Sequence, residues 1–148
     1  MRAQIDAWED KKQEELGISW SWGGNKGIKQ ILVVDDEVRI RTIYQNIFKM
    51  MGFKVFTTAN TTDTCIVLAA EKIDVVILDI NLREPNRGVL YPLIRTFCKK
   101  AKVIVASVYP VNEQMERIKD ADGYFDKADD KDVLVKMVSS FLEPKEAK

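Results

Sequence analysis

Five polar side chains that can do chemistry lie at the ends of short apolar runs. They are Asp35, Asp36, Asp79, Ser107 and Lys127. Clustered carboxylates repel one another, by about 4 kcal/mol for two charges roughly 4 Å apart at an effective dielectric constant of about 20. A hard cation such as Mg²⁺ relieves that repulsion. A carboxylate can also attack phosphorus, and cation, lysine and hydroxyl groups would then hold the phosphoryl oxygens. The pattern predicts Mg²⁺-dependent phosphoryl chemistry.

Composition excludes several other kinds of site. The 148 residues include no histidine, which removes Ser-His-Asp and Cys-His nucleophiles and His-ligated zinc. Lys plus Arg and Asp plus Glu both total 23, so no net basic field points to nucleic acid or to an anionic membrane. No apolar stretch predicts a membrane span or a signal peptide, and we expect a cytoplasmic protein. Cys65 and Cys98 are expected to be free, buried thiols.

Apolar, β-branched runs alternate with amphipathic segments along the chain. The runs predict strands at 31–34, 54–57, 75–78, 103–106 and 123–125, and the segments predict helices at 38–51, 63–72, 89–99, 113–119 and 130–141. This alternation is typical of a doubly wound α/β domain with a parallel sheet. The carboxyl ends of parallel strands share one edge, so we expect the five polar side chains to converge there.

The chain is expected to divide into three parts. Residues 1–29 form an N-terminal helical and aromatic extension with a linker, 30–143 form the α/β domain, and 144–148 are a tail. Trp8, Trp20 and Trp22 all lie in the extension, and we expect them to pack on the domain or on a second copy, or to serve a partner. Because so little follows the last helix, we expect no DNA-binding or catalytic output domain after it.

The motifs resemble those of a known family. Val-Val-Asp35-Asp36-Glu37, Val-Ile-Leu-Asp79, the strand ending at Ser107, and Tyr124-Phe125-Asp126-Lys127 resemble the signature positions of two-component receiver domains. The resemblance implies a CheY-like, flavodoxin-like sheet in the order 2-1-3-4-5 with helices on both faces. It also implies that Asp79 is the phosphoacceptor, that Lys127 contacts the phosphoryl group, and that Ser107 and Tyr124 form the switch.

The same resemblance implies a cofactor and partners. Mg²⁺ would be held by Asp36, Asp79 and the backbone carbonyl of Asn81, with Asp35 acting through a water. The phosphoryl donor would be a histidine kinase or a histidine phosphotransfer protein, since this chain contains no histidine. The module would not be an enzyme beyond its own phosphorylation and dephosphorylation. It would signal to an unknown target by phosphorylation-dependent protein binding, with a homodimer possible.

Four departures from the family pattern bear on this function. Ala128 replaces the usual proline after Lys127; a cis bond before alanine costs about 3–4 kcal/mol, so we expect a trans bond and a re-routed loop that displaces Lys127. Val108 is bulkier than the usual residue after the hydroxyl and is predicted to gate access to Asp79. The 81–88 loop is about one residue longer than usual. The stretch from Ser107 to Lys127 is about two residues shorter, which predicts a trimmed fourth helix.

Other functions compete with phosphoryl signalling. Val108 and Ala128 suggest a receiver-like interaction module with weak or lost phosphorylation. An Asp-nucleophile, Mg²⁺-dependent phosphohydrolase of the haloacid dehalogenase type would need a second acid two residues after Asp79, where this chain has Asn81. A flavodoxin-like FMN module would need a hydroxyl- and glycine-rich phosphate loop after the first strand, where Asp35-Asp36-Glu37 would repel phosphate.

Overall fold

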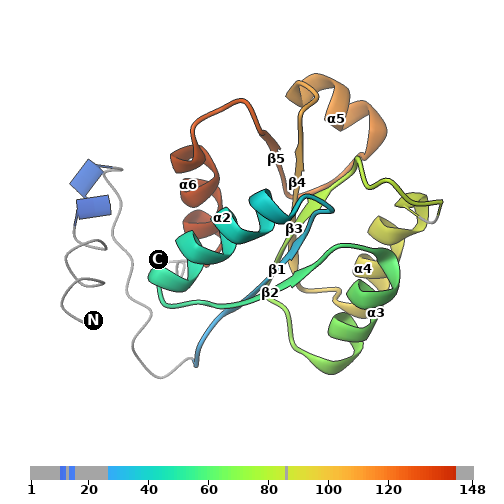
Figure 1. The fold of residues 1–148 in the computed structure, drawn as a ribbon, viewed down its shortest axis with the longest axis horizontal. Coiled ribbons are helices and arrows are strands. Elements are labelled where there is room, and N and C mark those ends of the chain that lie inside the picture. Colours follow the sequence, from blue (N-terminus) through green and yellow to red (C-terminus); the bar gives the residue numbers. More distant parts are fainter. Residues whose placement is uncertain (1–10, 13, 16–26, 86, 143–148) are drawn as a thin grey trace, which may run out of the picture.

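The computed structural model describes residues 11–12, 14–15, 27–85 and 87–142. Strands and helices alternate along the described chain (Figure 1). Its elements are β1 (Gln30–Val34), α2 (Val38–Met50), β2 (Lys54–Thr58), α3 (Thr61–Ala70), β3 (Val75–Asp79), the 3₁₀ turn η1 (Arg87–Val89), α4 (Leu90–Phe97), β4 (Lys102–Ser107), α5 (Val111–Arg117), β5 (Gly123–Asp126) and α6 (Lys131–Leu142).

The five strands form one parallel sheet in the order β2-β1-β3-β4-β5. The central strands β1, β3 and β4 are almost entirely buried, which explains why their sequences are continuous apolar runs. In register, Val34 of β1 lies beside Leu78 of β3, so Asp35 and Asp79 follow neighbouring positions. The α/β class and the strand order predicted from the sequence are confirmed.

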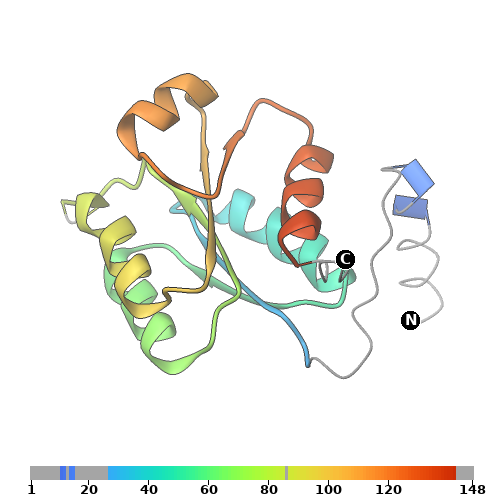
Figure 2. The ribbon, with the colours of Figure 1, turned by 180° about the vertical axis from the view of Figure 1, so that it is seen from behind.

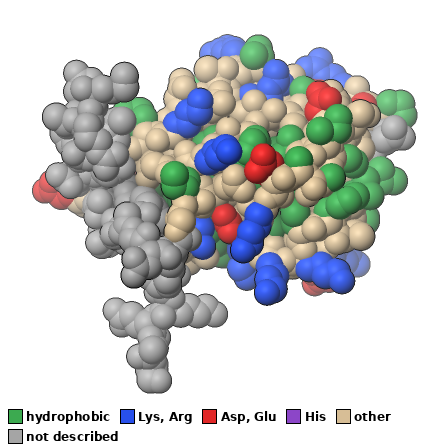
Figure 3. All heavy atoms as spheres, turned by 90° about the horizontal axis from the view of Figure 1, so that it is seen from below, with side chains coloured by type: hydrophobic (Ala, Val, Ile, Leu, Met, Phe, Trp, Pro, Cys, Tyr) green, Lys and Arg blue, Asp and Glu red, His purple; other side chains and the backbone are tan. Residues whose placement is uncertain are grey.

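Helices cover both faces of the sheet (Figures 1 and 2). On one face, Tyr44 and Phe48 of α2 and Leu134 of α6 pack on the sheet, and on the other Leu68 of α3 and Ile94 of α4 do so. In the view from below, apolar side chains gather on the side where α3 and α4 lie (Figure 3). The two cores fix the strands, and through them the polar groups at the carboxyl edge of the sheet.

Helix α5 contains 7 residues and is the shortest α-helix among the elements of the described chain. That it is trimmed relative to the family stays a prediction. Its Gln114 is fully buried. The amide nitrogen of Gln114 donates to the carbonyl oxygens of Tyr109, at 2.7 Å, and of Phe125, at 2.9 Å, while its Oε1 is buried without a hydrogen-bond partner. One side chain therefore joins the β4–α5 loop to β5.

Only a small part of the N-terminal extension is described. Lys12 forms an ion pair with Asp132 at the start of α6, with 2.9 Å between Nζ and Oδ1. The three tryptophans lie outside the described residues, so their predicted packing stays a prediction. Cys65 and Cys98 are free, as expected, but they are half-buried and not fully buried. Among the described residues, no helix is long and apolar enough to cross a membrane.

Candidate functional site

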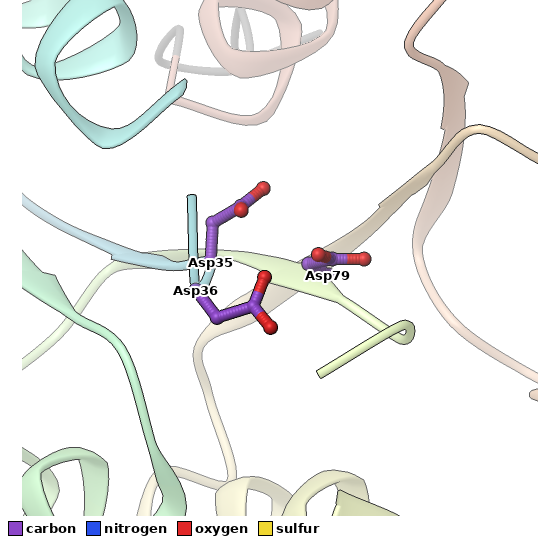
Figure 4. A group of neighbouring side chains, drawn as sticks. All are labelled: Asp35, Asp36 and Asp79. Carbon is purple, nitrogen blue, oxygen red and sulfur yellow. The ribbon is translucent and has the colours of Figure 1, made fainter. Parts of the chain in front are cut away.

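Three carboxylates meet at the carboxyl edge of the sheet (Figure 4). Asp35 and Asp36 follow β1, and Asp79 is the last residue of β3, the strand beside β1. One oxygen from each carboxylate lies within 4.8 Å of the others. Asp35 and Asp79 are buried, whereas the side chain of Asp36 is 20% exposed. The predicted convergence of these residues is confirmed, and their mutual repulsion requires positive charge nearby.

Lys127 supplies positive charge on the buried side of the cluster. Its Nζ lies 2.6 Å from Oδ2 of Asp35 and 3.3 Å from Oδ2 of Asp79. Burial raises the pKa of Asp79, against the opposing effects of the Asn81 backbone N–H and of the Lys127 charge. Burial alone would lower the pKa of Lys127, but its hydrogen bond to Asp35 and the charge of Asp79 raise it above the ordinary value. Lys127 therefore stays charged against both acids.

The loop after β5 holds Lys127 in place without a proline. The Lys127–Ala128 bond is trans, as expected, but the predicted displacement of Lys127 is wrong. The backbone N–H of Lys127 donates to the carbonyl oxygen of Ser107 at 2.8 Å, which continues the β4–β5 pairing beyond β5. The N–H of Ala128 donates to Oδ1 of Asp126 at 2.8 Å and closes a short turn. These two bonds define the path of the chain that proline would otherwise restrict.

Ser107 ends β4 beside the acid cluster, and it is fully buried. Its Oγ accepts hydrogen bonds from Nδ2 of Asn81, at 3.2 Å, and from the backbone N–H of Tyr109, at 3.1 Å. Because the hydroxyl oxygen is the acceptor in both bonds, its proton can be donated to a third group. Asn81 also donates its backbone N–H to Oδ1 of Asp79 at 2.8 Å. Asn81 thus links the hydroxyl to the buried acid.

The two remaining predicted residues, Tyr124 and Val108, make no hydrogen bond or ion pair with the acid cluster among the described residues. Tyr124 in β5 is half-buried, and its hydroxyl donates to the carbonyl oxygen of Ile118 at 2.7 Å and accepts from the N–H of Ala121 at 3.2 Å. Val108 is 68% exposed, directly after Ser107. Val108 follows the carboxyl end of β4, whereas the Tyr124 hydroxyl bonds to the segment between α5 and β5. The switch role of Tyr124 and the gate role of Val108 stay predictions.

Sequence reasoning missed two residues that contact the acids. Arg41 of α2 donates from Nη1 to the backbone carbonyl oxygen of Asp35 at 2.7 Å. Arg83 donates to Oδ2 of Asp36 from its backbone N–H, at 3.0 Å, and from Nε, at 3.3 Å. The sequence did show that the lengthened 81–88 loop contains a basic residue, Arg83, and this could have predicted the second contact. The first depends on the orientation of α2, which sequence periodicity does not specify.

The donor atoms of the cluster fit a hard divalent cation. Carboxylate oxygens are the ligands that Mg²⁺ prefers, and Mg²⁺ typically uses one or two carboxylates and keeps several waters. Asp35, Asp36 and Asp79 can each supply one oxygen, and Lys127 takes up part of the charge of the two buried acids. No histidine or thiolate lies in this donor set, which disfavours zinc.

A doubly wound sheet in the order 2-1-3-4-5 with such an acid cluster at its switch point defines the receiver class of signalling domains. The family model described as the response regulator receiver domain matches residues 31–139, and the chain belongs to this family. The resemblance seen in the motifs is thereby confirmed.

Individual relatives agree with this assignment. The chain is 24% identical over 116 residues to sporulation initiation phosphotransferase F of Bacillus subtilis, covering 77% of this chain and 94% of that protein. Response regulator TrrA of Thermotoga maritima, solved in complex with Mg²⁺-BeF, is 30% identical with a TM-score of 0.69, covering 78% of this chain and 100% of that one. TrrA in complex with histidine kinase ThkA gives 28% identity and a TM-score of 0.67 over the same shares of both chains.

Other relatives are much longer than this chain. The match spans 22% of the probable transcriptional regulator ycf27 of Cyanophora paradoxa and 24% of the putative response regulator NtrX-like of Rickettsia bellii. The similarity to these proteins therefore concerns their receiver domains. Receiver domains of this family are signalling modules of two-component systems.

Proposed function

We propose that this domain accepts a phosphoryl group on Asp79 with Mg²⁺ and signals through protein–protein contacts. The observation that carries the proposal is the position of Lys127, whose Nζ lies within 3.3 Å of Asp79 and 2.6 Å of Asp35 in a site with three converging carboxylates. A buried lysine beside two buried acids is not required for stability, because apolar residues of similar size can fill such a space with a smaller desolvation penalty. Phosphoryl transfer needs this arrangement.

The residues of the chain divide the work of the transfer. A carboxylate oxygen of Asp79 would attack phosphorus while the bond from phosphorus to the donor nitrogen, or to the oxygen of an acyl phosphate, breaks. Lys127 would hold one phosphoryl oxygen, and the Ser107 hydroxyl would donate to another. Asp36, Asp79 and the Asn81 carbonyl would hold Mg²⁺, with Asp35 acting through a water. Bound Mg²⁺ would offset negative charge on the phosphoryl oxygens.

The partners follow from the phosphoryl chemistry. The donor would be a histidine kinase or a histidine phosphotransfer protein, since the chain has no histidine of its own; the complex of TrrA with ThkA supports a kinase. Such donors place the proposed site of action in the cytoplasm. Movement of Ser107 toward the phosphoryl group would be read out through Tyr124 to α5, β5 and α6, where a target protein or a second copy would bind.

Intact mass after incubation with Mg²⁺ and a small acyl phosphate tests the proposal directly. The wild type should gain the mass of one phosphoryl group, and Asp79→Ala should gain none. Asp129→Ala is a matched control, because Asp129 is an exposed acid a short way along the same edge, and it should behave as the wild type. A wild type that stays unmodified, also with a beryllofluoride mimic, would favour an interaction module without phosphorylation. Turnover of generic phosphoesters would favour a hydrolase.

Val108 motivates the weaker form of the proposal, in which phosphorylation is slow. Its side chain is 68% exposed beside Ser107 and would narrow the approach to Asp79. Val108→Ala should therefore raise the rates of phosphorylation by a small acyl phosphate and of dephosphorylation by water several-fold, measured by mass against time. Val111→Ala, at an apolar residue of the same region, is the control. Unchanged rates in Val108→Ala would contradict a gate.

A further inference from the structure

Arg83 occupies the exposed side of the acid cluster. Its backbone N–H and its Nε both reach the same oxygen, Oδ2 of Asp36, at 3.0 and 3.3 Å. The arginine side chain is 81% exposed, whereas that of Asp36 is 20% exposed. Among the described residues, Arg83 is the cation that pairs with Asp36, just as Lys127 is the cation that pairs with Asp35 and Asp79.

Hydrogen bonds anchor the loop that carries Arg83 on both sides of this residue. Asn81 contacts Asp79 and Ser107 through its backbone N–H and its side chain. Glu84 accepts hydrogen bonds at Oε1 from the backbone N–H of Thr61, at 2.8 Å, and from the Thr61 hydroxyl, at the first turn of α3. Residues 81–84 therefore run as a strap from the buried acid to α3, with Arg83 held over Asp36 at its centre.

Arg83 occupies the same carboxylate, Asp36, that a metal ion would use. A divalent cation held by Asp36 needs a carboxylate oxygen, and Oδ2 of Asp36 already accepts two hydrogen bonds from Arg83. Arg83 and a metal ion would relieve the same repulsion among the three carboxylates, so each lowers the free energy gained from the other at Asp36. An exposed guanidinium loses little when it returns to water. Arg83 can therefore leave Asp36 without disturbing the strap, which Asn81 and Glu84 continue to anchor.

We propose that Arg83 is an exchangeable counter-ion of Asp36 that competes with Mg²⁺ and thereby sets the affinity of the site for the metal. This inference rests on the proposed function, since it assumes that Asp36 is a metal ligand. When Mg²⁺ enters, the guanidinium swings into solvent and the backbone N–H of residue 83 remains near the carboxylate. The strap thus offsets part of the negative charge of the acid cluster in the metal-free protein and lowers its affinity for the metal.

Calorimetric titration of the full chain with Mg²⁺ at low ionic strength tests the competition without any phosphorylation. Arg83→Gln should bind Mg²⁺ about two- to fivefold more tightly than the wild type, the size expected when one exposed ion pair no longer competes. Arg83→Lys, which keeps the charge, should stay closer to the wild type than Arg83→Gln. The difference between wild type and Arg83→Gln should shrink at high salt.

The matched control is Lys119→Ala. Lys119 is an exposed cation that lines a hollow of about 340 Å³ beside Asp79 and pairs with no carboxylate of the described chain. Its removal should leave Mg²⁺ affinity unchanged. Equal tightening by Lys119→Ala and Arg83→Gln would show a general charge effect and overturn the inference. Equal affinity of wild type and Arg83→Gln would also overturn it, whereas failure of the wild type to bind Mg²⁺ would overturn the proposed function itself.

Discussion

The acid cluster has two sides, and each has its own cation. On the inner side, Lys127 and Asp35 have side chains that are 10% and 2% exposed, and their atoms approach to 2.6 Å. On the outer side, Arg83 and Asp36 are 81% and 20% exposed, and their side chains approach to 3.3 Å. The inner pair is shielded from water and salt, while the outer pair is screened by both. The cluster thus has a shielded positive charge at Asp35 and Asp79 and a solvent-exposed one at Asp36.

This difference matches what each side would do in the proposed phosphoryl transfer. A lysine that contacts both Asp35 and Asp79 is already in position to meet a phosphoryl oxygen, so no charge has to be moved into a buried space. In the proposed mechanism a metal ion would enter and leave, and the exposed Arg83–Asp36 pair is the one that water screens most. Variants of the two cations, and of the acid between them, test this division.

The largest effect is expected on the inner side. Lys127→Met leaves Asp35 and Asp79 buried without their cation, and breaking a buried pair by removing one partner should lower the free energy of unfolding by about 3 kcal/mol. Urea unfolding with a chelator present measures this loss, and added Mg²⁺ should recover part of it. Lys131→Met, at an exposed lysine of α6, should change little. Equal stability of Lys127→Met and the wild type would show that the inner pair is not shielded.

A smaller effect of opposite sign is expected at Asp79. Its raised pKa means that the folded state holds the proton more tightly than the unfolded state, so the ionised carboxylate costs stability once the pH exceeds the unfolded-state pKa. Asp79→Asn removes this cost and keeps an oxygen for the Asn81 N–H. We expect a gain of about 1 kcal/mol at neutral pH without metal, and no gain at acid pH, where the carboxyl group is protonated in both states.

Thermal unfolding with a chelator at neutral and acid pH measures this difference. Asp129→Asn serves as the control, because Asp129 is exposed and its charge is solvated. If Asp79→Asn were less stable than the wild type at neutral pH, the attraction between Lys127 and Asp79 would outweigh the desolvation penalty of the Asp79 carboxylate. The ionised Asp79 would then stabilise the fold, which contradicts the prediction.

The smallest effect on stability is expected on the outer side. Arg83→Gln removes a screened ion pair and should change the free energy of unfolding by less than about 0.5 kcal/mol. The change should vanish in high salt, whereas the loss in Lys127→Met should persist. Chemical unfolding of both variants at low and high ionic strength makes the comparison. A large, salt-insensitive loss in Arg83→Gln would make the outer pair a structural contact like the inner one.

Much of the fold and of the inner site could be predicted from the sequence, because both follow from strand ends. Continuous apolar runs mark the buried strands, and the rule that parallel strands share a carboxyl edge brings Asp35, Asp79, Ser107 and Lys127 together. Lys127 was the exception. Its expected displacement assumed that the turn depends on proline, whereas the β4–β5 pairing beyond Ser107 and the Asp126 side chain define the same path.

The contact between Arg83 and Asp36 could not be predicted in the same way, because loops have no periodic pattern of apolar residues that indicates their path. The extra length of the 81–88 segment was visible, but its direction depends on where Glu84 meets α3 and Arg83 meets Asp36. Gln114 was unpredictable for a related reason. A polar residue in a short helix is normally assigned to the solvent side, and only the packing of α5 on β5 shows that it is inside.

The hydrogen bonds of Gln114 also couple the local unfolding of α5 to that of β5. Its amide bonds the loop after Ser107 to β5, the four-residue strand at the edge of the sheet, and its own oxygen has no partner to lose. Local unfolding of α5 would therefore withdraw a donor from both carbonyl groups at once. We expect the backbone amides of α5 and β5 to exchange with deuterium as one cooperative unit, faster than those of β1 and β3.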